Sequence, residues 1–208
     1  MAYQLYWRKG SATFVAEAAL KMAGAEYELI EVPDRNNQRS PEFRAINPAG
    51  KIPVLITHDG HIIFETMAIL LTLDERHKDA KLLPPLGSNE RATSLQWLAF
   101  LATSSYGAAL RFYYPNRFTA EKTPEAIEAV KAKSVTDSDT DFAILCAALK
   151  GPFLLGDTMT ITDVYLAMIA DWHEPAMEMP KIKSLISSML KNASVKAAWD
   201  SHEYTPET

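Results

Sequence analysis

Two short segments constrain this chain most. Residues 47–55 read Asn-Pro-Ala-Gly-Lys-Ile-Pro-Val-Leu, and residues 65–69 read Glu-Thr-Met-Ala-Ile. The first combines turn-forming residues with an apolar stretch, so it predicts a loop that enters a strand with Pro53 at its start. The second places the carboxylate of Glu65 and the hydroxyl of Thr66 where a helix begins. Because the first N–H groups of a helix have no intrahelical partner, such a helix start favours an anion.

The first 80 residues alternate between strand and helix patterns. Gly24 is placed to end the first helix, Ser40 to cap the second, and Asp59-Gly60 to turn a hairpin. The predicted elements are strands at 3–7 and 26–32, helices at 11–23 and from 40 onward, a hairpin of 54–57 with 62–64, and a helix at 65–77. This order predicts one α/β domain over residues 1–80.

The rest of the chain is helical in pattern. Residues 81–88 contain two prolines and a glycine and predict a linker, since these residues end helices. Residues 89–208 then predict an all-helical domain, with helices from 88 to about 113, at 123–133, at 137–149, after 160 and between 181 and 199. Thr160 and Asp163 have capping-box spacing, which predicts a structural role for both.

Composition excludes several classes of function. The formal charge of −5 and the absence of a basic stripe argue against a general nucleic-acid binder. No apolar run approaches the roughly 18 residues of a membrane span, and the N-terminus lacks the pattern of a signal peptide. A single cysteine, Cys146, excludes an internal disulfide, and the five histidines show no metal-ligand spacing. We therefore expect a reduced, cytoplasmic protein without a metal site.

Three spaced motifs carry a resemblance to a known family. Residues 47–55 fit Asn-Pro-x-x-x-Ile-Pro-x-Leu, residues 65–69 fit Glu-Ser-x-Ala-Ile with threonine for serine, and residues 156–163 fit Gly-Asp-x-x-Thr-x-x-Asp. In this order they resemble the cytosolic glutathione transferases, here of a bacterial type with the subclass open. The resemblance implies an α/β thioredoxin-like N-terminal domain followed by an all-α helical C-terminal domain. It also implies a homodimer that uses reduced glutathione as co-substrate and holds no cofactor tightly.

The resemblance assigns the glutathione site to five residues. It implies a cis bond before Pro53, which leaves the backbone of Ile52 free to pair with the cysteinyl part of glutathione. Thr66 suits the carboxylate of the γ-glutamyl end, Glu65 suits its ammonium, and Lys51 suits a carboxylate. The alternatives are an ordinary strand-edge proline at 53, plain N-capping by Thr66 and a solvated lysine at 51.

The catalytic step requires a donor to the glutathione sulfur. A free thiol titrates at about 8.5, and lowering this pKa to about 6.5 takes roughly 2.7 kcal/mol of thiolate stabilisation. The resemblance places the donor in the loop after the first strand, where Gly10-Ser11 matches the serine-type members. Ser11 is our first candidate, Thr13 the second and Tyr6 the third, with helix capping the alternative role for Ser11. The cysteine-using class has a cysteine where this chain has Ala12, so a serine-type site is favoured.

The second substrate is expected to be a small hydrophobic electrophile. By resemblance, its pocket draws on the first loop and the long helix, where Trp7, Tyr106, Tyr113 and Arg117 are candidates. Aromatic residues at helical spacing are also common in cores. The rival interpretations are a non-catalytic binding protein of the same fold, or an isomerase, dehalogenase or peroxidase that uses the same glutathione site. Glu65, Thr66 and the Ile52-Pro53 pair favour the enzyme, because a scaffold has no need of them.

Overall fold

The computed structural model describes residues 2–204, which form two compact units. The first unit contains residues up to Pro85 together with those from Met189 onward, and the second contains Leu86–Ser188. The sequence pattern predicted a single helical domain over residues 89–208. The last helix, α11 (Ala193–Ser201), instead packs against α1 (Thr13–Met22) in the first unit.

The first unit is built on a four-stranded mixed sheet in the order β2-β1-β3-β4. Its strands are β1 (Tyr3–Trp7), β2 (Tyr27–Glu31), β3 (Val54–Ile56) and β4 (Ile62–Phe64). Strand β1 pairs parallel with β2 and antiparallel with β3, and β3 pairs antiparallel with β4. The predicted thioredoxin-like arrangement of the N-terminal domain is confirmed.

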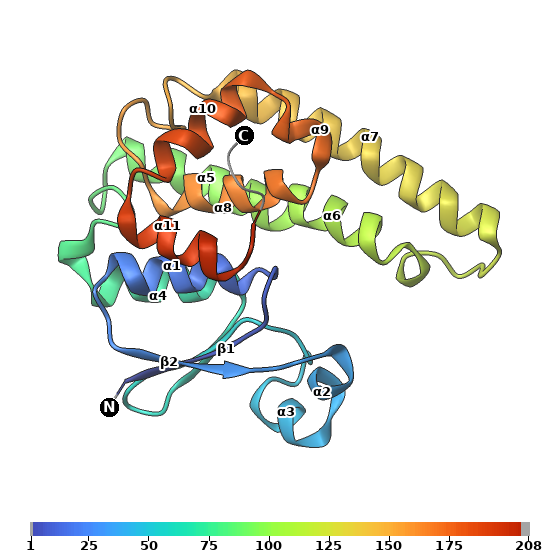
Figure 1. The fold of residues 1–208 in the computed structure, drawn as a ribbon, viewed down its shortest axis with the longest axis horizontal. Coiled ribbons are helices and arrows are strands. Elements are labelled where there is room, and N and C mark those ends of the chain that lie inside the picture. Colours follow the sequence, from blue (N-terminus) through green and yellow to red (C-terminus); the bar gives the residue numbers. More distant parts are fainter. Residues whose placement is uncertain (1, 205–208) are drawn as a thin grey trace. The chain divides into compact units, whose positions relative to one another are not determined.

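Helices lie on both faces of this sheet (Figure 1). Helices α1 and α4 (Thr66–Arg76) pack together on one face, while α2 (Arg35–Arg39) and α3 (Pro41–Ile46) lie apart from them. Side chains of β1 alternate accordingly, because successive residues of a strand point to opposite faces. Leu5 is fully buried. Tyr6, on the opposite face, packs against Phe43 of α3 in a separate apolar cluster.

The second unit is helical, as predicted. Its helices are α5 (Asn89–Phe100), α6 (Tyr106–Tyr113), α7 (Pro124–Ala148), α8 (Ile161–Asp171), α9 (Glu174–Met177) and α10 (Pro180–Met189), the last of which ends at the boundary between the units. A π-helical turn, Leu101–Ser105, joins α5 to α6 without a break. Helix α8 is buried on all sides from Ile161 to Ala170, and its Thr162 hydroxyl lies 2.8 Å from the Ser94 hydroxyl of α5.

One predicted break in the second unit is absent. The sequence analysis separated helices at 123–133 and 137–149, but these residues form the single helix α7. The intervening residues include neither glycine nor proline, so nothing there ends a helix. Ser134 is fully buried, and its hydroxyl donates to the Lys131 carbonyl at 2.6 Å, a bond compatible with the helix.

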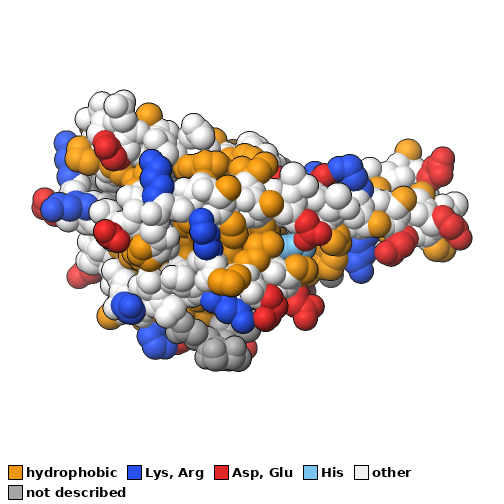
Figure 2. All heavy atoms as spheres, turned by 90° about the horizontal axis from the view of Figure 1, so that it is seen from above, with side chains coloured by type: hydrophobic (Ala, Val, Ile, Leu, Met, Phe, Trp, Pro, Cys, Tyr) orange, Lys and Arg blue, Asp and Glu red, His pale blue; other side chains and the backbone are white. Residues whose placement is uncertain are grey.

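The surface mixes charges of both signs. On the face drawn in Figure 2, Lys and Arg side chains are interspersed with Asp and Glu side chains. Within residues 2–204, no helix combines the length and apolar character needed to cross a membrane.

Candidate functional site

The sheet brings three candidate segments to one end. In the antiparallel register, Val54 at the start of β3 faces Tyr6 near the end of β1 and Phe64 at the end of β4. The residues just before Val54 therefore lie beside those that follow β1 and β4. These are the Ile52-Pro53 pair, the loop after Trp7, and the turn at Glu65. The topology alone thus places the three predicted parts of the site at the same end of the sheet.

The loop before β3 is held by its own asparagine. Asn47 is buried, its Nδ2 donates to the Lys51 carbonyl at 2.7 Å, and its Oδ1 accepts from the Ala49 N–H at 3.0 Å. These bonds fix the backbone ahead of the Ile52-Pro53 peptide, which is cis as the resemblance implied. The Lys51 side chain is exposed.

Glycine is required at position 50 of this loop. Gly50 has φ +61°, and a Cβ there would lie 2.9 Å from the backbone carbonyl oxygen of Gln38. Its N–H donates to the Asn47 carbonyl at 2.8 Å. Because a backbone atom leaves little room to adjust, any side chain at this position would displace the loop.

Glu65 has an uncommon backbone conformation. Its φ of 71° and ψ of 117° lie outside the regions favoured by residues other than glycine. It is the N-cap of α4, and its carbonyl accepts from the Ile69 N–H at 3.0 Å, yet its exposed side chain makes no capping hydrogen bond in the described structure. The carboxylate is thus presented to solvent rather than used by the helix.

Thr66 is the first residue of α4 and is buried. The alternative that it serves as the N-cap does not describe this helix, because Glu65 holds that position. Glu65 therefore has a strained backbone, while its side chain forms no capping bond to the helix. Backbone strain of this kind clusters at functional sites.

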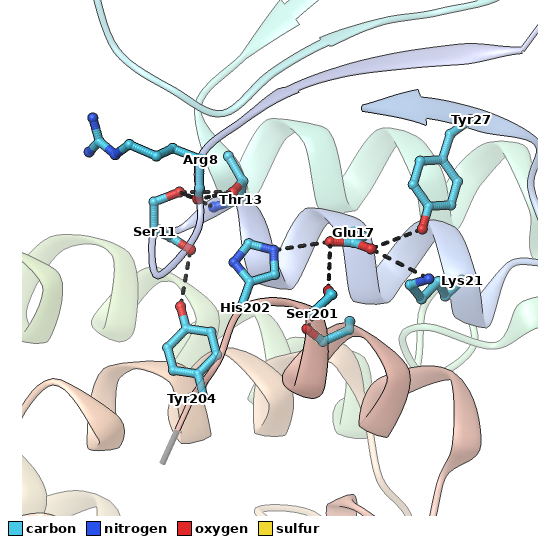
Figure 3. Close-up of polar contacts among 10 residues, drawn as sticks. Arg8, Ser11, Thr13, Glu17, Lys21, Tyr27, Ser201, His202 and Tyr204 are labelled. Carbon is cyan, nitrogen blue, oxygen red and sulfur yellow. Dashed lines mark hydrogen bonds and ion pairs between the residues drawn. The ribbon is translucent and has the colours of Figure 1, made fainter. Parts of the chain in front are cut away.

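The loop after β1 contains a compact hydroxyl cluster (Figure 3). Ser11 Oγ donates to the Arg8 carbonyl at 2.6 Å, Thr13 Oγ1 donates to the same carbonyl at 3.1 Å, and the two hydroxyl oxygens are 2.8 Å apart. These three contacts share only two hydroxyl protons, so one contact lacks a hydrogen. If Thr13 alone donates to Arg8, the Ser11 hydroxyl can turn its proton to a ligand without leaving the carbonyl unpaired.

The three donor candidates differ in position. Ser11 is half-buried and precedes α1, whose N-cap is Ala12, so its hydroxyl is not the cap of that helix. Its Oγ accepts a long contact, 3.4 Å, from the Thr13 N–H. Thr13 is fully buried, and Tyr6 packs against Phe43 on the sheet face opposite Leu5. Of the three, Ser11 combines partial exposure with a place beside a helix start.

The candidates for the acceptor pocket lie in both units. In the second unit, Tyr106 contacts the Trp172 ring with 5.6 Å between centroids, and the Tyr113 hydroxyl donates to the Trp172 carbonyl at 3.2 Å. Desolvation, with a smaller contribution from Asp171, raises the pKa of Tyr113. The guanidinium of Arg117 lies over the Tyr114 ring.

Trp7 belongs to the first unit. It ends β1, and its ring contacts the His202 ring with 5.3 Å between centroids.

The one cysteine, Cys146, is half-buried on α7 and its Sγ lies 3.6 Å from the Met179 sulfur. Burial raises the pKa of this thiol, which disfavours a reactive thiolate.

Sequence reasoning missed a buried polar network in the first unit. Glu17 of α1 is 1% exposed and accepts from the Tyr27 hydroxyl at 3.0 Å and from His202 Nε2 at 3.0 Å, while Lys21 Nζ lies 3.4 Å away. Burial alone would raise the pKa of Glu17, but its interactions with His202, Tyr27 and Lys21 together lower it. The only signal in the sequence was an acidic residue within the apolar run 14–20.

A second missed contact joins the end of the chain to the serine loop. The Tyr204 hydroxyl donates to the Ser11 carbonyl at 3.1 Å. These residues are 193 positions apart, and no periodicity or motif relates them.

Comparisons with known proteins identify the family of the chain. The family model described as glutathione S-transferase, N-terminal domain, matches residues 1–75, and the corresponding C-terminal domain matches residues 99–184. Glutathione S-transferase GstA of Escherichia coli O157:H7 is 25% identical over 172 residues, 81% of each chain. Maleylacetoacetate isomerase of Dictyostelium discoideum is 38% identical over 100 residues, 47% of this chain and 45% of the relative.

A solved structure extends the match to nearly the whole chain. The crystal structure of a glutathione transferase homologue from Sulfitobacter with bound glutathione superimposes with a TM-score of 0.87 at 25% identity, over 96% of this chain and 97% of that one. The fold and the order of the two domains therefore agree with the prediction, and the chain belongs to the glutathione S-transferase family.

Proposed function

We propose that the chain binds reduced glutathione at the sheet end described above, through Lys51, Ile52, Pro53, Glu65 and Thr66. The observation that carries this proposal is the backbone of Glu65, whose φ of 71° holds an exposed carboxylate at a helix start without a capping bond. Such a carboxylate suits the ammonium of the γ-glutamyl group, and the N–H groups of α4 suit its carboxylate. The Sulfitobacter homologue was crystallised with bound glutathione, which supports glutathione as the ligand.

The cysteinyl part of glutathione would lie along Ile52. The cis Ile52-Pro53 peptide precedes β3, so the backbone groups of Ile52 lie outside the ladder that begins at Val54. Two backbone hydrogen bonds there would hold the ligand in a strand-like conformation. Lys51, exposed next to this backbone, is placed to meet a carboxylate of the ligand.

Ser11 is our candidate for the donor that holds the sulfur as thiolate. Its hydroxyl shares the Arg8 carbonyl with Thr13, so the threonine can keep the carbonyl paired when Ser11 turns to the sulfur. Hydrogen bonds to a charged acceptor are the stronger kind, which lowers the pKa of the bound thiol. The thiolate then attacks a small hydrophobic electrophile.

Removal of single hydroxyls tests this assignment. In turnover of 1-chloro-2,4-dinitrobenzene, the sulfur bonds to the ring carbon, chloride leaves, and the thiol proton goes to solvent. We expect Ser11→Ala to reduce kcat/KM by about tenfold or more, since a lost charge-assisted hydrogen bond costs about 1.5–3 kcal/mol. Tyr6→Phe should change it less than twofold. A Ser11→Ala enzyme with wild-type kcat/KM would move the role to whichever of Thr13→Val or Tyr6→Phe reduces it.

A glutathione-dependent isomerisation is the second candidate. It is favoured by the match to the Dictyostelium discoideum protein named maleylacetoacetate isomerase and to a Caenorhabditis elegans protein named probable maleylacetoacetate isomerase, 29% identical over 163 residues. In such a reaction the same thiolate adds to a double bond and is then expelled. Turnover of a cis-dienoic acid with no net consumption of glutathione would identify it.

Three wider assignments complete the proposal. We infer that the chain forms a twofold homodimer and acts in the cytoplasm on free glutathione, with no tightly bound cofactor. Light scattering on the purified protein would report a mass near twice 23.1 kDa for the dimer. A monomeric mass would exclude it.

A further inference from the structure

We propose that Tyr204 is a positioning residue for the Ser11 hydroxyl, and that the C-terminal segment Trp199 to Tyr204 thereby sets the geometry of the serine loop. The serine loop is residues 8–13. The inference rests on the proposed function, since it takes Ser11 as the donor to the glutathione sulfur. All the residues involved belong to the first unit.

The carbonyl of Ser11 receives two donors from different parts of the unit. The Phe14 N–H donates to it at 3.1 Å from the first turn of α1, and the Tyr204 hydroxyl donates to it at 3.1 Å from the end of the chain. Two donors at one carbonyl fix the peptide plane that follows Ser11. The direction in which Ser11 projects its side chain depends on that plane, so the orientation of its Oγ does as well.

Figure 3 shows how the two sides of Ser11 are held. On one side its hydroxyl meets Arg8 and Thr13, and on the other its carbonyl meets Tyr204. When the Ser11 hydroxyl donates its one proton to a ligand, it can no longer donate that proton to the Arg8 carbonyl. The carbonyl side has no such competition and can keep the backbone in place during that exchange.

Tyr204 is itself firmly placed. It is 5% exposed, and its ring contacts the rings of Phe14, Trp199 and His202 with centroid separations of 4.8, 4.9 and 5.8 Å. Phe14 is the second residue of α1; its ring contacts Tyr204, and its N–H donates to the Ser11 carbonyl. A buried aromatic with a fixed ring can aim its hydroxyl with little freedom.

Polar contacts secure the rest of the segment. His202 Nε2 lies 3.0 Å from the buried Glu17 of α1, and Ser201 Oγ lies 3.5 Å from the same carboxylate. Glu203 forms an ion pair with Lys9, which is itself in the serine loop. The segment therefore contacts Lys9 in the serine loop and Glu17 in α1, which lie on the two sides of Ser11 in the sequence.

The test compares two tyrosines that each lose one hydroxyl. Tyr204→Phe keeps the ring and removes the hydroxyl that donates to Ser11, while the Phe14 N–H still pairs that carbonyl. Tyr27→Phe is the matched control, since its hydroxyl donates to Glu17 and not to the loop. Both are compared with wild type and Ser11→Ala for the pKa of enzyme-bound glutathione, followed by the ultraviolet absorbance of the thiolate, and for kcat and the KM for glutathione.

We expect Tyr204→Phe to raise the pKa of the bound thiol by about 0.5 unit and to lower kcat about threefold at a pH below that pKa, with the KM for glutathione unchanged. Tyr27→Phe should leave all three values unchanged. In the double variant Ser11→Ala/Tyr204→Phe, the second change should add nothing, because the hydroxyl that Tyr204 positions is already gone.

Other outcomes overturn the inference in distinguishable ways. If Ser11→Ala raises the thiol pKa and Tyr204→Phe does not, Tyr204 is not a positioning residue and the proposed role of Ser11 stands. If neither variant changes the thiol pKa, the role of Ser11 and the inference both fail. If Tyr204→Phe acts equally in the presence and absence of the Ser11 hydroxyl, its effect does not pass through Ser11.

Discussion

The carboxylate of Glu17 in α1 lies 3.0 Å from the Nε2 of His202, and both side chains are almost completely excluded from solvent. Within residues 2–204, the other ring nitrogen, Nδ1, has no hydrogen-bond partner. A proton on Nε2 leaves Nδ1 as an unfilled acceptor, which is less costly than a buried donor without a partner. His202 thus donates to Glu17 and joins the end of the chain to its first helix.

The first prediction concerns the acid stability of the first unit. The pKa of Glu17 is lowered below its ordinary value of 4.5, so the folded state favours the ionised carboxylate. The stabilisation is fully present above the unfolded pKa and is lost as pH falls through the folded pKa. In urea titrations, the free energy of unfolding of wild type should therefore fall below pH 4.5 more steeply than that of Glu17→Gln.

At neutral pH, Glu17→Gln should cost about 1–2 kcal/mol, because its amide replaces a charged acceptor at a buried site. Comparing the two proteins at each pH cancels the contribution of the other carboxyl groups. Parallel stability curves from pH 3 to pH 7 would contradict the assigned pKa direction.

The second prediction follows from the backbone of Glu65. Alanine and glycine at this position both remove the carboxylate, but only glycine tolerates φ near 71° without strain. Glu65→Gly should therefore be more stable than Glu65→Ala by about 1 kcal/mol in thermal or urea unfolding, the reverse of the usual order in a helix. An alanine variant as stable as the glycine variant would mean that the turn relaxes easily.

The third prediction separates steric conflict from backbone strain in the loop before β3. Gly50 and Gly24 both have φ +61°, but a Cβ meets the Gln38 carbonyl at 2.9 Å only at Gly50; at Gly24 it meets none of the described atoms within 4 Å. Gly24→Ala should cost about 1 kcal/mol from strain alone, and Gly50→Ala should cost about 1–3 kcal/mol more.

Because the Gly50 loop leads to Ile52, Gly50→Ala should also weaken glutathione binding, whereas Gly24→Ala should not. Equal stabilities for the two variants would show that the Gln38 carbonyl moves aside freely.

The fourth prediction addresses the motif in the second unit. The Asp163 carboxylate accepts from the N–H groups of Leu154 and Thr160, each at 2.8 Å, and from the Thr160 hydroxyl at 2.9 Å. Asp163→Ala leaves these buried donors unpaired and should cost about 2–4 kcal/mol in unfolding experiments. The exposed Asp157, six residues earlier in the same motif, provides the control, and Asp157→Ala should change stability by less than about 0.5 kcal/mol.

For Asp163→Ala, the fraction that remains folded should retain its kcat. A specific loss of kcat without a loss of stability would assign Asp163 a catalytic role that the structure gives no reason to expect.

Sequence reasoning predicted the fold because its signals are local. Gly24, the Ser40-Pro41 pair and Asp59-Gly60 each end or begin an element through their own backbone preferences. The family and the fold class were confirmed by the comparisons, whereas the assignment of individual site residues remains a prediction. The prediction of two helices in place of α7 was wrong, since residues 134–136 contain neither glycine nor proline to end a helix.

Long-range contacts were beyond the reach of the sequence. Tyr204 follows the last helix and has no pattern that relates it to Ser11, and no pattern indicates that His202 is buried, at 2% exposed. Such contacts depend on how α11 packs against α1, which is determined by the shapes of many apolar side chains together. A single sequence contains no local signal for that packing.

The most direct test of the central claim is calorimetric titration of reduced glutathione into wild type, Glu65→Ala and Glu75→Ala. Glu75 is an exposed residue of α4 and controls for the loss of one surface charge. We predict that wild type and Glu75→Ala bind with equal Kd and that Glu65→Ala binds at least about tenfold more weakly, a loss of about 1.4 kcal/mol or more. Equal affinity of Glu65→Ala and wild type, or no binding by wild type at millimolar glutathione, would contradict the account.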